Sequence, residues 1–241
     1  MEQPALTSTG EALPRPEGLQ GIIADWSSDQ RAFKNVPWGK AMMWIFLLSD
    51  TFIFSSFLIS YMTVRMSTTD PWPNPSEVFG LTLFGQSIPL LLIAIMTFVL
   101  ISSSGTMAMA VKFGYEKNRK MTFILLLCTA ALGATFVGMQ AFEWTKLILH
   151  EGIRPWGNPL GAAQFGAAFF MITGFHGTHV SIGVIFLLIT ATKVIRGDLD
   201  HERPGFMTGR KGKYEIVEIM GLYWHFVDLV WVFIFAVFYL W

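Results

Sequence analysis

Five long apolar stretches constrain this chain more than any other feature of its sequence. They cover residues 41–64, 83–111, 121–142, 164–192 and 216–241. A helix needs about 20 apolar residues to cross the ~30 Å hydrocarbon core of a bilayer, and each stretch reaches that length. Only 14% of the residues are charged, whereas soluble domains have roughly 25%. We therefore predict an all-α integral membrane bundle of five transmembrane helices.

The first 40 residues have a different character. They contain four prolines, and their longest apolar run is the three residues 22–24. Such a segment is too short to span a membrane, and no basic stretch leads into an apolar core as in a cleavable signal peptide. We predict a polar, cytoplasmic N-terminal arm at residues 1–40, followed by one membrane domain at residues 41–241.

The Lys and Arg residues predict the direction of insertion. Fourteen of them fall in the arm, after the second stretch or after the fourth, and three fall in the two remaining loops. Because cytoplasmic loops carry the excess of positive charge, the N-terminus is predicted inside and the C-terminus outside. The formal net charge of zero gives no sign of a nucleic-acid partner, and the single Cys128 excludes an intrachain disulfide.

Asp50 lies about ten residues into the first apolar stretch, near the middle of the membrane. An ionisable side chain at that depth costs about 2.5 to 3.5 kcal/mol on insertion scales, so it normally faces protein or water. Two interpretations are open. Asp50 is either a protonatable site or polar contact to a partner subunit, or a neutral, hydrogen-bonded carboxyl that tightens packing.

The third stretch ends with Glu143, which we expect to be a solvated carboxylate at the outer boundary. The same stretch carries Ala130, Ala134 and Gly138 at four-residue spacing. Small residues at that spacing lie on one face of a helix and let a second helix approach closely. We therefore predict helix packing on that face.

The fourth stretch contains His176 and His179, which share a helix face because they are three residues apart. Two such histidines could bind a metal, but no third His or Cys ligand is near them in the sequence. Neutral histidines that hydrogen-bond between helices are the default expectation, so no metal site is assigned.

In the fifth stretch, Glu218, His225 and Asp228 fall within an arc of roughly 80° at about 100° per residue. We predict one polar stripe that faces the bundle interior, with His225 and Asp228 close enough to pair. The stripe is either a proton relay or a polar clamp to the fourth helix. The clamp is favoured because no ionisable residue continues the line beyond Asp228.

Two segments closely resemble the signature segments of haem-copper oxidase subunit III, the family that includes cytochrome c oxidase subunit III. They are GFHGTHV at residues 174–180 and YWHFVDLVW at residues 223–231. Further similar features follow in the family's order, namely Ser49-Asp50, the segment 140–144 (QAFEW), and Glu218 seven residues before His225. The resemblance extends over residues 41–241.

The chain departs from that family in two ways. Members commonly have seven helices, so this chain resembles the shorter, five-helix bacterial type, and the lipid-binding cleft beside the first two helices is missing or completed by another chain. The intramembrane carboxylate is usually Glu in the family, whereas Asp50 is one methylene shorter.

The resemblance implies a subunit without redox centres or catalytic residues, in a complex that reduces O₂ to water and pumps protons. Haem and copper are expected in partner subunits, and the partners are catalytic subunit I and subunit II. Bound phospholipid and a location in the bacterial inner membrane are expected as well. The subunit would support assembly, proton uptake and stability of the catalytic subunit, with Asp50, Glu143, His176, His179, Glu218, His225 and Asp228 in structural or proton-related roles.

Several alternatives stay open at this point. The partner enzyme could oxidise cytochrome c or quinol, or be a nitric oxide reductase. A b-type cytochrome membrane anchor would need a haem between the fourth and fifth helices. A small transporter would need a broken helix, for which Pro89 is the only hint.

Overall fold

The computed structural model describes residues 38–83, 86–88, 90–200 and 214–241. Most of the predicted arm and part of the loop after the fourth helix therefore lie outside the described residues. The elements in chain order are α2 (Trp38–Ser67), α3 (Pro75–Val78), β1 (Leu81–Leu83), β2 (Gln86–Ile88), α4 (Leu91–Tyr115), α5 (Arg119–Leu149), α6 (Ala163–Arg196), α7 (Glu215–Phe235) and the π-helical turn η1 (Ala236–Leu240). Five of the helices are long and apolar enough to cross a membrane, which confirms the predicted all-α membrane fold.

The second helix begins later than predicted. Strands β1 and β2 pair antiparallel, with Leu81 opposite Ile88 and Leu83 opposite Gln86, and α4 starts at Leu91. The prediction of a helix from residue 83 is therefore wrong. Pro89 explains the boundary, because a proline disfavours the helical conformation of the residue before it and lacks the amide proton that a helix needs.

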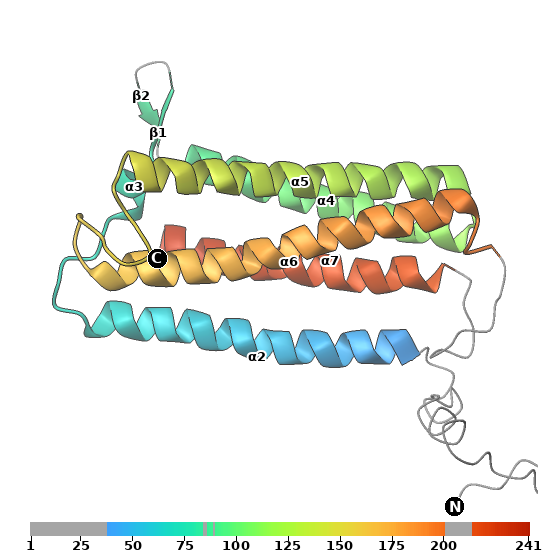
Figure 1. Ribbon diagram of the computed structural model, residues 1–241, viewed down its shortest axis with the longest axis horizontal. Helices are drawn as coiled ribbons and strands as arrows, with labels where there is room; N and C mark the ends of the chain where they lie inside the picture. Colours follow the sequence, from blue (N-terminus) through green and yellow to red (C-terminus); the bar gives the residue numbers. More distant parts are fainter. Residues whose placement is uncertain (1–37, 84–85, 89, 201–213) are drawn as a thin grey trace, which may run out of the picture.

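Four helices form a closed ring. Contacts link α4 to α5, α5 to α6, α6 to α7, and α7 back to α4. Figure 1 shows α5 and α6 in front of α4 and α7. The remaining membrane helix, α2, lies at the edge and contacts α7 and α6.

The indole side chains of α7 fill the centre of the ring. Trp224 and Trp231 are both fully buried. Gly133 on α5 and Gly183 on α6 lie so close to Trp224 that a Cβ at either position would collide with the indole ring. Of the predicted small face on α5, Ala130 is buried but Ala134 and Gly138 are exposed, so the helices of this chain cover only part of that face.

Candidate functional site within the membrane bundle

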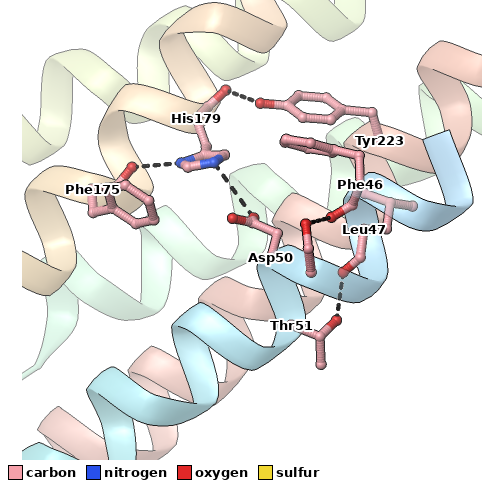
Figure 2. Close-up of polar contacts among 8 residues, drawn as sticks. Phe46, Leu47, Asp50, Thr51, Phe175, His179 and Tyr223 are labelled. Atoms are coloured by element: carbon pink, nitrogen blue, oxygen red, sulfur yellow. Dashed lines mark hydrogen bonds and ion pairs between the residues drawn. The ribbon is translucent and has the colours of Figure 1, made fainter. Parts of the chain in front are cut away.

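Asp50 on α2 and His179 on α6 point toward one another (Figure 2). The Asp50 side chain is buried, and its Oδ2 lies 3.4 Å from His179 Nε2. The other ring nitrogen, Nδ1, is 2.8 Å from the carbonyl oxygen of Phe175, and the Tyr223 hydroxyl on α7 donates to the carbonyl oxygen of His179. Asp50 therefore makes a polar contact within this chain.

The hydrogen bonds of His179 limit where protons can be. A carbonyl oxygen only accepts, so Nδ1 must carry a proton to bond Phe175. In a neutral imidazole Nε2 then has a lone pair, which would repel an ionised carboxylate. The contact is attractive when one further proton sits either on Asp50 or on Nε2. Asp50 and His179 thus form a pair that shares a proton site.

His176 is enclosed by aromatic rings. It stacks on Trp231 at a centroid distance of 5.4 Å and meets the edge of Phe136 at 5.8 Å. Neither ring nitrogen has a hydrogen-bond partner among the described residues. The prediction of interhelical hydrogen bonds therefore fails for His176. For His179, an interhelical polar contact is present.

Glu143 is buried, so the prediction of a solvated carboxylate is wrong. Gln140 Nε2 donates to its Oε2 at 2.8 Å, and the Tyr239 hydroxyl donates to its Oε1 at 3.2 Å. Tyr239 comes from η1, at the end of the chain. The carboxylate therefore links α5 to the last turn after α7, and its hydrogen bonds offset the cost of burial.

Glu218 lies near the start of α7 and joins three helices. Its Oε1 is 2.7 Å from Lys40 Nζ on α2, and its Oε2 accepts a hydrogen bond from Tyr115 at the end of α4. Both charged side chains are about one quarter exposed. This ion pair fixes the end of the bundle that we predict to be cytoplasmic.

His225 and Asp228 do not continue from Glu218 as one interior stripe. His225 is exposed, and its Nδ1 lies 2.5 Å from Ser104 Oγ on α4. Asp228 is buried, but neither of its carboxylate oxygens has a well-formed hydrogen bond with the described residues. The predicted clamp to the fourth membrane helix, α6, is therefore wrong. The polar contact of His225 is with α4, which is the second membrane helix.

The sequence interpretation missed the residues of α4 that meet α7. Trp224 Nε1 donates to Ser103 Oγ at 2.9 Å, and Trp231 Nε1 donates to Thr97 Oγ1 at 3.0 Å. With the Ser104 contact, these bonds form a row of hydroxyl partners along the α4–α7 boundary. The run of three serines at residues 102–104 inside an apolar helix was the signal that could have found them.

The three histidines within the membrane helices lie in three different environments. His176 lies against Trp231, His179 faces Asp50, and His225 contacts Ser104. Within the described residues, no three His, Cys, Asp or Glu side chains are grouped so that they could hold a metal ion. The arrangement offers polar contacts between helices and one proton-sharing pair.

The comparisons with known proteins identify the family of the chain. Residues 31–241 match the family described as cytochrome c oxidase subunit III. A probable quinol oxidase subunit 3 from Staphylococcus saprophyticus is 29% identical over 212 residues, which cover 88% of this chain and 92% of that protein. A protein of the same description from Staphylococcus aureus strain USA300 is 30% identical over 203 residues, 83% of this chain and 88% of the relative. The chain is therefore a member of the cytochrome c oxidase subunit III family, the third subunits of haem-copper oxidases.

Proposed function

We propose that this chain is the non-redox subunit III of a bacterial terminal oxidase that reduces O₂ to water and pumps protons. The observation that carries the proposal is the family match over residues 31–241, which includes all five membrane helices. A third subunit of a haem-copper oxidase works in a complex with other oxidase subunits. We assign catalytic subunit I and subunit II as its partners, with haem and copper held by those chains.

The role of the subunit is contact and support. Asp50 contacts His179, and this contact joins α2 to α6. Glu143 accepts hydrogen bonds from Gln140 and Tyr239, and the second of these joins α5 to η1. Neither contact needs a metal. A bundle held in this way presents a fixed surface to the catalytic subunit. The subunit would thereby aid assembly, maintain proton uptake and prolong the active life of the catalytic centre.

Bound phospholipid is part of the proposal. An apolar groove of about 650 Å³ lies between α2, α6 and α7, with Met43, Phe46, Ile182 and Ile219 among its lining residues and Lys193 at one end. Its size and apolar walls fit an acyl chain, and the ammonium group of Lys193 fits a lipid phosphate. Extraction and mass spectrometry of lipids that copurify with Lys193→Ala would show a lower phospholipid content.

The electron donor has two candidates. The family description points to cytochrome c, whereas the relatives quoted above are described as probable quinol oxidase subunits. Oxygen consumption by the purified complex with reduced cytochrome c and with a quinol distinguishes the two, because the donor site belongs to other subunits.

Removal of the subunit is the main test. The complex purified without this chain should keep its full haem and copper content while its proton uptake weakens or its active life shortens. Loss of haem or copper on removal would contradict a purely supporting role. Iron or copper bound stoichiometrically to the isolated chain, and lost in His176→Ala or His225→Ala, would identify a b-type cytochrome instead.

Membrane location and orientation have a separate test. We place the chain in the cytoplasmic membrane with its N-terminus inside, on the strength of the asymmetric distribution of Lys and Arg. A reporter that is active only outside should work when fused after Trp241 and fail when inserted at Asn118, between α4 and α5. The opposite result would reverse the orientation.

A further inference from the structure

His225 has an unusual place on the membrane-facing surface. It follows the start of α7 by ten residues, which is about 15 Å along the helix and so near the middle of a ~30 Å hydrocarbon core. In the described membrane helices, the other exposed His, Lys, Arg, Asp and Glu side chains lie within about one turn of a helix end. His225 is thus a polar ring exposed at the depth where water is absent.

Exposed hydroxyl groups on the same helices do not share this difficulty. Ser56, Thr135 and Thr178 are exposed, and each donates its hydroxyl proton to the carbonyl oxygen four residues earlier on its own helix. Such side chains can face lipid without a partner, because their own helix satisfies the donor. A helix backbone offers no comparable bond to the second nitrogen of His225.

The hydrogen bond between His225 and Ser104 leaves one ring nitrogen unsatisfied in either tautomer. If the serine hydroxyl donates to Nδ1, a neutral ring carries its proton on Nε2, which then needs an acceptor. If Nδ1 donates instead, Nε2 needs a donor. No hydrogen bond joins Nε2 to the residues that the structure describes. An unsatisfied polar group at this depth costs free energy that a protein neighbour can recover.

Asp228 adds a second, independent observation. It lies three residues after His225, about 60° around the helix, and its side chain is only 8% exposed. The Ser104 hydroxyl is close enough to interact with it, but it has one proton to donate, either to Asp228 or to His225 Nδ1. Both carboxylate oxygens lack a well-formed hydrogen bond with the described residues. A buried carboxyl and an exposed imidazole therefore lie one helical turn apart on α7, each with hydrogen-bonding capacity to spare.

We propose that this place is where one transmembrane helix of the catalytic subunit docks, an inference that rests on the proposed function. The α4–α7 surface is defined by Ile101 and Ser104 on α4 and by His225, Asp228 and Leu229 on α7. The docking helix presents a hydroxyl or carboxamide side chain to His225 Nε2, because either group can donate or accept. Ile101 and Leu229 are 58% and 54% exposed and supply the apolar contact beside that bond.

The first experiment uses photo-crosslinking to locate the partner in the intact complex. A photo-reactive amino acid replaces Leu229 or Ile101 on the α4–α7 surface, or Ile185 on α6 as a control of matched exposure, 57%. The surface positions should crosslink to the catalytic subunit, and Ile185 should not. Crosslinks only to lipid, only to a second copy of this chain, or to the catalytic subunit from Ile185 alone would overturn the assignment.

The second experiment tests the hydrogen bond. His225→Leu should lower the amount of catalytic subunit that copurifies with the tagged chain by roughly three-fold, the size of an average interhelical hydrogen bond in a membrane. His225→Gln, which keeps donor and acceptor groups, should restore most of it. Thr178→Val, an equally polar-to-apolar change at an exposed position on α6, should have no effect. Equal losses in the Leu and Gln variants would overturn the role of the bond.

Copurification and crosslinking distinguish a wrong family role from a wrong docking surface. If the wild-type chain copurifies with no haem-bearing subunit, the proposed function is wrong. If it copurifies with one but crosslinks from another face, the family role stands and the α4–α7 surface is wrong as the docking site.

Discussion

The first and last membrane helices are held by different forces. In α7 half of the most apolar window is buried, against 17% in α2, because α7 contacts α4, α6 and α2 whereas α2 lies at the edge. The fully buried side chains of Trp224 and Trp231 hold α7 in place by close packing against its neighbours. The edge helix has polar contacts to other helices at two depths, from Lys40 to Glu218 on α7 and from Asp50 to His179 on α6.

Polar contacts and close packing are effective at different places in a membrane bundle. Inside a membrane, lipid is as apolar as leucine, so a helix with few close contacts gains little from burying apolar side chains. A helix at the edge therefore depends on hydrogen bonds and ion pairs to hold its position. A central helix depends on close packing of its side chains. Trp224 on α7 fits only because Gly133 and Gly183 lie opposite it.

The largest loss of stability should follow from removing a buried tryptophan of α7. Trp224→Ala removes a fully buried indole and leaves Ser103 without its donor, so we expect a loss of about 3 to 5 kcal/mol in the free energy of unfolding. Titration of the purified chain from mild detergent into denaturing detergent, followed by helical circular dichroism, measures it. Phe233→Ala on the same helix, at a 56% exposed position, is the control and should change little.

A loss at Phe233 as large as that at Trp224 would contradict this expectation, because it would show that α7 is not held by its buried face. Gly133→Leu offers a second route to the same conclusion. Its new side chain would collide with Trp224, and overpacking of this kind costs about 1 to 3 kcal/mol.

An intermediate effect should follow from the Asp50–His179 pair. Asp50→Leu removes the polar partner of His179 Nε2 and should cost at most about 1 to 2 kcal/mol, the range for interhelical polar contacts in model membrane peptides. Asp50→Asn keeps a donor for Nε2 and should preserve assembly. Asp50→Lys should impair assembly by placing a bulky charge in a buried site. Blue native electrophoresis of the complex, with Ser49→Ala as the exposed control, gives the readout.

Loss of the complex in the Asn variant would contradict this expectation and show that the ionised carboxylate is required. In that case α2 would depend on a charge at mid-membrane and not on a neutral polar contact.

The sequence predicts the five helices well because span length follows directly from bilayer thickness. It places the start of α4 too early, since hydropathy alone does not register the effect of Pro89 on the preceding residue. The contact of Glu143 with Tyr239 could not be predicted, because the two residues are far apart in the sequence. The three serines at residues 102–104 indicate hydroxyl partners inside the membrane, but not that Ser104 meets His225. Helical periodicity gives the angle between Glu218 and His225 but not which neighbouring helix each one meets.

The smallest effect should come from the ion pair at the start of α7. Lys40 and Glu218 are each about one quarter exposed, and pairs that are open to solvent contribute about 0.2 to 1 kcal/mol. Lys40→Gln should cost no more than that, because Tyr115 still donates to Glu218. A double-mutant cycle with Glu218→Gln isolates the coupling, which should shrink as salt is raised from 0.1 M to 1 M, where the screening length falls from about 10 Å to about 3 Å. A coupling that is larger than that of Asp50 with His179, or that does not respond to salt, would mean that α2 is anchored mainly at its end and not along its length.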